Sequence, residues 1–385
     1  MSGFEEPLDR QTYVRLAWPE QNRHLRKSRR KSVMFTLRQA AARTAAATAA
    51  AALLLAGCSS STDTTADSTD TTTAEASTET LVVYSGRDAE LIDPLIEQFE
   101  QSSGISVDVR YAGTTELAAQ LLEEGEDTPA HVFLSQDAGA LGAVSAAGLF
   151  ATLPTEISDA VATEYTSRDG SWVGLTGRAR VVAYDSERLS ADQVPGDIFA
   201  FTEPEWNGRV AIVPTNASFQ AHVTAIRVLE GEDRAREWLE GLIANDAQIF
   251  ARNGEVLEAV NTGAVEIGLI NHYYWARSEQ DPTTLRAQLK FGDPGSVSAL
   301  VNVTGAGIIN TAAESEDARA FVEYLVSSDA QTYFVEETYE YPLAPGLDGP
   351  RDVPPLDQLG EPDIDLSQLD SLEQTVQLLT SVGLL

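Results

Sequence analysis

The sequence predicts an α/β fold in which a parallel sheet is covered by helices on both faces. Short apolar strands alternate along the chain with segments of helical periodicity, and such βαβ repeats join parallel strands. The composition supports a folded protein, because 43% of the 385 residues are hydrophobic and 22% are charged. A chain of this length has room for two or three domains.

The first set of elements follows residue 80. The apolar run at 81–85 predicts a strand, and the apolar residues between Leu91 and Phe99 recur at helical spacing. Alternation at 105–109 predicts a second strand, leucines at helical spacing predict a helix at 114–124, and the run at 131–135 predicts a third strand.

A second set of elements follows the same logic. We expect strands at 181–184, 209–213, 266–270 and 305–309, and helices at 218–229, 235–243 and 315–327. In doubly wound sheets, ligands bind beyond the carboxyl ends of the strands. Three polar segments hold that position, namely 85–88, 135–137 and 271–274.

The first 80 residues predict a targeting segment followed by a tether. A basic block at 26–31 precedes a small, apolar run that ends in Leu55-Ala56-Gly57-Cys58, which resembles the lipobox of bacterial lipoproteins. We therefore expect a signal peptide at 1–57, with 1–33 as possible extra upstream residues, and lipidation of Cys58. The Ser- and Thr-rich stretch 58–80 lacks large apolar residues and predicts a disordered tether.

Composition excludes several classes of function. The 26 Lys and Arg against 59 Asp and Glu give a net charge of -33, which argues against binding nucleic acid. One cysteine excludes an intrachain disulfide and a thiolate zinc site. No phosphate loop, dinucleotide fingerprint or nucleophile elbow occurs, so we expect a protein that is not an enzyme. A surface adhesin or assembly lipoprotein, or a secreted hydrolase that uses Asp and Glu, remains a rival.

An ordered set of motifs carries a family resemblance. From Leu81 to the end, the chain resembles the ferric-ion binding proteins of bacterial iron ABC transporters, in the periplasmic binding protein superfamily. The matching stretches are Val83-Tyr-Ser-Gly-Arg87, Leu121-Leu-Glu-Glu-Gly125, Thr128-Pro-Ala130, Val132-Phe133, Leu175-Thr-Gly-Arg-Ala-Arg-Val-Val182, Ala251-Arg-Asn-Gly254, Ile270-Asn-His-Tyr-Tyr-Trp275 and Glu340-Tyr-Pro-Leu343.

The resemblance implies a type II fold of two lobes, with a hinge of crossover strands and a ligand cleft between the lobes. It places the N-lobe at 81–180 plus 305–345 and the C-lobe at 181–304 plus 346–385. It also implies a monomer that is lipid-anchored on the extracytoplasmic face of the cell membrane. Such a protein hands Fe(III) to an ABC permease driven by a separate ATPase.

The family's adjacent iron-binding tyrosines match Tyr273 and Tyr274. Phenolate oxygens suit a small, highly charged ion such as Fe(III), although the residues alone equally allow the pair to pack in the core beside Trp275. Asp88 stands where many members have a ligating His, and we expect it to supply a third ligand or else to cap a helix. Gln136 stands where members have Glu, and we expect Gln136 and Asp137 to lie beside the metal. Phe219 stands where one branch has a third Tyr, and a Phe cannot ligate.

The family often holds a synergistic anion, carbonate or phosphate, with groups of the C-lobe. The positions that match are Asn216, Ala217, Ser218, Asn253 and Asn271, with Arg178 or Arg180 near the lobe crossover as an anion partner. A helix N-terminus with free N–H groups is a reasonable anion cradle. The related branches bind thiamine, polyamines, phosphonates or other oxyanions, so the same fold with another ligand stays open.

Overall fold

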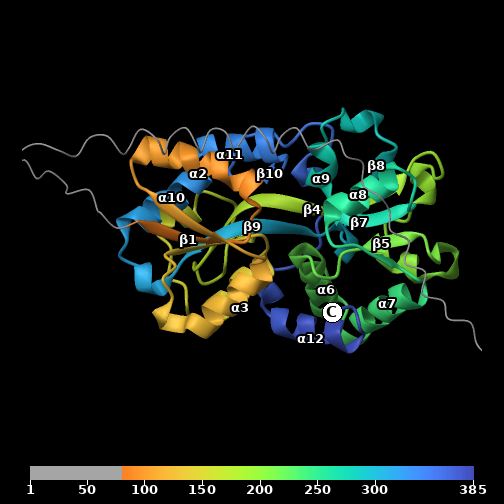
Figure 1. Cartoon of the computed structure of the whole chain (residues 1–385), viewed down its shortest axis with the longest axis horizontal. Helices are drawn as coiled ribbons and strands as arrows, with labels where there is room; N and C mark the ends of the chain where they lie inside the picture. The colour runs from red at the N-terminus through yellow and green to blue at the C-terminus, as the bar shows by residue number, and fades with distance from the viewer. Residues whose placement is uncertain (1–79) are drawn as a thin grey trace, which may run out of the picture. The chain divides into compact units, whose positions relative to one another are not determined.

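The structure is a computed structural model that describes residues 80–385. The predicted signal peptide, Cys58 and all but the last residue of the predicted tether lie outside these residues. Figure 1 shows the strands in the centre and helices on both sides of them. The strands are β1 (Leu81–Ser85), β2 (Val107–Tyr111), β3 (Val132–Ser135), β4 (Val173–Asp185), β5 (Val210–Ile212), β6 (Gln248–Ile249), β7 (Ile267–Asn271), β8 (Ala287–Phe291), β9 (Val301–Ile308) and β10 (Tyr341–Pro342).

The helices lie between the strands and after them. They are α2 (Ala89–Ser103), α3 (Thr114–Glu124), α4 (Ala138–Ala146), α5 (Thr155–Ser158), α6 (Ala217–Leu229), α7 (Glu232–Ala244), α8 (Asn253–Asn261), α9 (His272–Ala276), α10 (Glu316–Val326), α11 (Ser328–Tyr333) and α12 (Leu372–Ser381). The predicted helix at 114–124 is confirmed, and those predicted at 218–229, 235–243 and 315–327 are confirmed within three residues at each end.

The long strand β4 divides the sheet into two parts. The strand order is β2-β1-β3-β9-β4-β7-β5-β6, with β8 and β10 also paired to β4. Up to Ala179, β4 pairs with β9, whereas from Arg180 it pairs with β7 and β8. We call β1, β2, β3, β9, β10 and the first part of β4 the first half-sheet. The second half-sheet consists of β5, β6, β7, β8 and the rest of β4.

The expectation of a wholly parallel sheet is wrong. The pairs of β1 with β2 and β3, and of β5 with β6 and β7, are parallel. The pairs that involve β4 or β9 are antiparallel. The sheet is mixed because β4 and β9 run in opposite directions side by side where the two half-sheets meet. Strand β9 starts at Val301, four residues before the strand predicted from Gly305.

Both faces of the second half-sheet are buried, as expected from continuous apolar strands. Successive residues of β4 face different cores: Val181 and Ala183 pack in one cluster, and Val182 and Tyr184 in the other. On the first half-sheet, α2 and α10 meet through Phe99 and Phe321, whose ring centroids lie 5.1 Å apart. These cores fix the strand ends that carry the polar loops.

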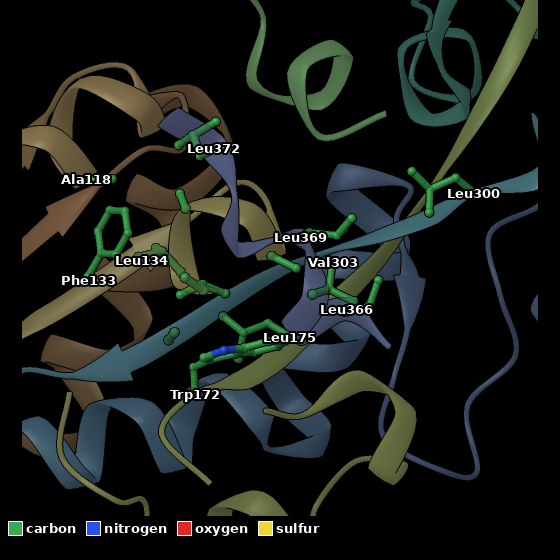
Figure 2. Close-up of a cluster of buried hydrophobic side chains, with 14 of the residues drawn as sticks. Ala118, Phe133, Leu134, Trp172, Leu175, Leu300, Val303, Leu366, Leu369 and Leu372 are labelled. Atoms are coloured by element: carbon green, nitrogen blue, oxygen red, sulfur yellow. The ribbon is translucent and has the colours of Figure 1, made fainter. Parts of the chain in front are cut away.

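The C-terminal segment contacts helices of both half-sheets. Figure 2 shows Leu366 and Leu369 near Val303 of β9, and all three belong to one apolar cluster. Gly139 of α4 allows this packing, since a Cβ there would lie 2.9 Å from the carbonyl oxygen of Leu369. Further along, Thr375 of α12 bonds Thr224 of α6 at 2.7 Å. The residue ranges of the two lobes stay a prediction.

Candidate metal-binding cleft

A cavity of about 520 Å³ lies between loops of the two half-sheets. The first half-sheet contributes the loops after β1, β2 and β3, and the second contributes the turn before α6 and Ala251. Four of the predicted site residues line it, namely Asp88, Gln136, Asn216 and Ala217. The cavity thus lies beyond the carboxyl ends of parallel strands, where α/β folds bind ligands.

The tyrosine pair sits on α9, which starts directly after β7. Neighbours in the sequence anchor this short helix: the N–H of Ala179 donates to His272 Nδ1 at 3.1 Å, and Trp275 Nε1 donates to the carbonyl of Ala287 at 2.8 Å. Between these anchors the rings of Tyr273 and Tyr274 stack, with centroids 4.4 Å apart and planes at 28°. Tyr273 is itself only 1% exposed, and Tyr274 packs against the apolar cluster that contains Trp275, so the tyrosines also pack in the core.

The surroundings of the tyrosine pair oppose ionisation of the Tyr274 phenol. Burial raises the pKa of Tyr274, the adjacent Tyr273 raises it further, and the Asp88 carboxylate adds to the effect. The guanidinium of Arg277 lies 5.8 Å from the ring centroid of Tyr273 and 5.4 Å from that of Tyr274. The Tyr274 phenol therefore stays protonated until a cation displaces its proton.

Asp88 occupies the N-cap position of α2 but makes no cap hydrogen bond with its side chain. The side chain is exposed, lines the cavity, and acts on the pKa of Tyr274. The structure thus brings the carboxylate of the first half-sheet within electrostatic reach of the tyrosine pair of the second. The capping explanation for this Asp finds no hydrogen bond to support it.

The turn before α6 carries the predicted anion cradle. The side chain of Asn216 accepts the N–H of Ser218 at 3.0 Å. The Ser218 hydroxyl in turn accepts from Arg178 Nη1 at 3.3 Å and from Asn271 Nδ2 at 3.0 Å. Arg180 donates to Asn271 Oδ1 at 2.9 Å, so a chain of side-chain hydrogen bonds joins β4, β7 and the start of α6.

Two buried donors of this hydrogen-bond network lack a hydrogen-bond partner among the described residues. They are Nε and Nη2 of Arg178, and the Nε lies 3.8 Å from Glu340 Oε1. Burial lowers the pKa of Arg180 to about 10, and the neighbouring charge of Arg178 acts in the same direction. Buried donors of a positive cluster that lack acceptors are the groups an anion would satisfy.

The two positions expected beside the metal have other partners. Gln136 Nε2 donates to the carbonyl of Gly86 at 2.8 Å, so its amide holds the loop after β1. Asp137 caps α4 by accepting the N–H of Ala140 at 3.0 Å. Burial raises the pKa of Asp137 to about 6, against the lowering effect of Ala140 and Arg178. Phe219 is buried and stacks on Trp238, with ring centroids 5.8 Å apart.

Sequence reasoning missed a buried ion pair next to Asp88. Arg87 donates two hydrogen bonds to Glu340, each of 2.9 Å, and both side chains are fully buried. Glu340 also lies 3.8 Å from Arg178 Nε. Both residues belong to quoted motifs, but only a three-dimensional pairing shows that residues 253 positions apart share one site.

Within residues 80–385, no three His, Asp or Glu side chains converge as a metal-binding group. Tyr273 and Tyr274 are not among the residues that line the cavity. The same part of the chain has no helix with the length and apolarity needed to cross a membrane.

Comparisons with known proteins show the family of this chain. Residues 127–358 match the family described as bacterial extracellular solute-binding protein. An Fe(3+)-binding periplasmic protein of Serratia marcescens is 32% identical over 318 residues, which cover 81% of this chain and 93% of that protein. The major ferric iron-binding protein of Neisseria meningitidis is 32% identical over 312 residues, 79% of this chain and 93% of that protein.

Solved structures share the fold. Iron-bound HitA from Pseudomonas aeruginosa superposes with a TM-score of 0.75 at 30% identity, covering 79% of this chain and 99% of that one. The Trichodesmium protein IdiA (FutA), solved with iron and citrate, gives a TM-score of 0.65 at 25% identity, covering 80% of this chain and 100% of that one.

Proposed function

Since this chain belongs to the bacterial extracellular solute-binding proteins, we propose that it captures Fe(III) outside the cytoplasm and delivers it to an ABC permease driven by a separate ATPase. The fold is that of type II periplasmic binding proteins. The family binds solutes for transport and does not catalyse reactions.

The stacked tyrosine pair is the observation that carries the proposal. Two phenols at the start of α9, held by His272 and Trp275, present adjacent oxygens without needing to reorganise the backbone. Phenolate is an anionic oxygen ligand, which a trivalent ion favours over neutral or soft donors. Iron must displace both protons, so capture strengthens as the pH rises.

Asp88 supplies the third protein ligand in this proposal. Its carboxylate lines the cavity from the side of the first half-sheet and directly follows the buried Arg87 in the sequence. Two phenolates and one carboxylate leave coordination positions of Fe(III) for an added anion or water. Gln136 and Asp137 lie in the neighbouring loop: Gln136 lines the cavity and holds the Gly86 carbonyl, and Asp137 acts through the start of α4.

Carbonate or phosphate completes the site at the start of α6. Ser218, Asn253, Asn271 and Arg178 form a donor-rich wall, and Arg178 has buried donors without a hydrogen-bond partner among the described residues. Citrate accompanies iron in the Trichodesmium structure, so a carboxylate anion is a third possibility for this chain.

The two half-sheets with their helices act as the two lobes, and β4 and β9 act as the hinge. Binding shifts an open–closed equilibrium toward the closed form, because the metal takes ligands from both sides of the cleft. The protein acts as a monomer, tethered to the extracytoplasmic face of the membrane by a lipid on Cys58. That cysteine lies outside the described residues.

Titration with ferric nitrilotriacetate tests the proposal. We expect one equivalent of iron, a visible tyrosinate-to-iron absorption band, and a reduced band in both Tyr273→Phe and Tyr274→Phe. These variants remove only an oxygen, so the melting temperature should stay within a few degrees. Equal iron binding by the double variant would exclude the pair as ligands and favour thiamine, a polyamine or an oxyanion as the cargo.

A further inference from the structure

One side-chain hydrogen bond links the helices on opposite sides of the cleft. Thr115 Oγ1, on the first turn of α3, donates to Gln220 Oε1 of α6 at 2.9 Å. Helix α3 follows β2 of the first half-sheet, and α6 follows β5 of the second. Thr115 also lines the cavity together with Asn216 and Ala217. The bond therefore lies at the edge of the proposed iron site.

The other end of the same amide holds the turn before α6. Gln220 Nε2 donates to the carbonyl of Pro214 at 3.2 Å, and the side chain is only 4% exposed. Pro214 directly precedes residues 215–217, which line the cavity. Because one amide bonds both Thr115 and Pro214, its orientation is fixed only when α3 lies against α6.

The start of α3 is tied equally firmly to its own side of the cleft. The hydroxyl of Thr114 donates to the carbonyl of Gly86 and accepts the N–H of Gln136, both at 3.2 Å. Gly86 permits this approach, since a Cβ there would collide with the Thr114 hydroxyl. Adjacent threonines thus have separate tasks: Thr114 organises the loops of the first half-sheet, and Thr115 reaches across.

We propose that Thr115 and Gln220 form a clasp, made only in the closed protein, that slows release of the cargo and positions the anion-binding turn before α6. The proposal rests on the proposed function for its cargo, but not for the clasp itself. Neither residue contacts the metal, so both are positioning residues. In the open protein water satisfies both side chains, and closing exchanges these waters for the bond.

The first test measures closure without any cargo. The described residues contain no cysteine, so full chain with Cys58→Ser can carry spin labels at Glu123→Cys on α3 and Glu240→Cys on α7, both exposed positions. Pulsed electron paramagnetic resonance then reports the distance between the labels on α3 and α7. Thr115→Val removes the hydroxyl at nearly constant volume, and we expect the ratio of short to long distances to fall about three- to tenfold.

Two matched variants separate the clasp from a general effect. Thr115→Ser keeps the hydroxyl and should restore the parent distribution. Thr332→Val removes a threonine hydroxyl that bonds the carbonyl of Ser328 within α11, at 2.8 Å, and should leave the distances unchanged. A parent distribution without the short distance, or one that Thr115→Val does not alter, would overturn the clasp.

The second test follows the iron. With ferric nitrilotriacetate, Thr115→Val should release iron about three- to tenfold faster, while the absorption band and the melting temperature of the empty protein stay unchanged. Unaltered release in a variant that loses closure would overturn the link to cargo retention. If the parent chain binds no iron while Thr115→Val still loses closure, the proposed function fails and the clasp stands.

Discussion

Replacing Glu340 by Gln removes the carboxylate that balances two buried guanidinium groups. Glu340 accepts two hydrogen bonds of 2.9 Å from Arg87 and lies 3.8 Å from Arg178 Nε. Thr176 and Thr338 each donate to it at 3.1 Å. The amide of Gln can keep part of this hydrogen bonding, but it cannot supply the negative charge.

The structure sets the size of the expected effect. The side chains of Arg87 and Glu340 are both 0% exposed, so no solvent screens the charge left behind. Removing one partner of a buried pair costs about 3–5 kcal/mol. Because the free energy of unfolding of a folded protein is typically about 5–15 kcal/mol, Glu340→Gln should remove a large fraction of it.

Urea unfolding of the cargo-free chain measures this loss. Glu255→Gln is the matched control, because Glu255 pairs at 3.3 Å with Arg252 in a pair whose side chains are 44% and 82% exposed. The control should cost under about 1 kcal/mol. Arg87→Met added to Glu340→Gln should cost less than the sum of the single changes, since the two residues interact directly.

A loss below about 1 kcal/mol in Glu340→Gln, or one equal to that of the control, would refute the reasoning. It would mean that Arg87 and Arg178 reach water when the carboxylate is removed. Additive effects of the two single changes would likewise show that the ion pair is not the source of the stability.

Other predictions test single groups. Asp88→Asn should lower ferric affinity at least about tenfold with an unchanged melting temperature, since its side chain makes no cap bond; equal affinity would exclude it as a ligand. Burial raises the pKa of Asp137 to about 6, so its stabilising contribution is present below about pH 4 and is lost between about pH 4 and 6. Asp137→Asn should therefore lose less stability than the parent in urea unfolding as the pH rises from 4 to 7, and an equal loss would contradict this. Burial lowers the pKa of His222 to about 3 and of His272 to about 4, so both contribute stability above about pH 6.5 that is lost as the pH falls; a melting temperature that stays level from pH 6.5 to 4 would contradict this. Cys58→Ser should abolish lipidation, which the mass of the purified protein would show.

The sequence predicted most helices closely because their apolar spacing is local information. It missed the first eight residues of β4, where Thr176, Arg178 and Arg180 interrupt the apolar run. Each of these polar side chains is satisfied in part by a residue far along the chain: Glu340, Ser218 and Asn271. Such pairings form only on folding, so the spacing of apolar residues in the sequence does not predict them. The mixed sheet was missed for the same reason, since strand direction depends on which strands become neighbours.

The candidate site divides in the same way. Tyr273, Tyr274 and Asp88 could be named from the sequence because motifs and strand ends mark them. The cap bond that the sequence allowed for Asp88 is absent from its side chain. Gln220 and Thr115 stand in unremarkable helical segments, and only the approach of α3 to α6 gives them a shared function.

The charges around the cleft limit which anion can complete the site. Three guanidinium groups, of Arg87, Arg178 and Arg180, are buried, and the buried carboxylates beside them within residues 80–385 are those of Glu340 and Asp137. The assembly of Fe(III) with two phenolates and one carboxylate carries no net charge.

One positive charge therefore stays uncompensated, and a buried net charge is costly in free energy. A monoanion such as bicarbonate or dihydrogen phosphate cancels it, whereas a dianion such as carbonate or sulfate replaces it by a negative charge, so the charge count favours the protonated form of either proposed anion. At constant pH and ionic strength, ferric affinity should be higher in bicarbonate than in sulfate. Equal or tighter binding in sulfate would show that water or a mobile cation compensates the cleft, and that the buried arginines do not select the anion by charge.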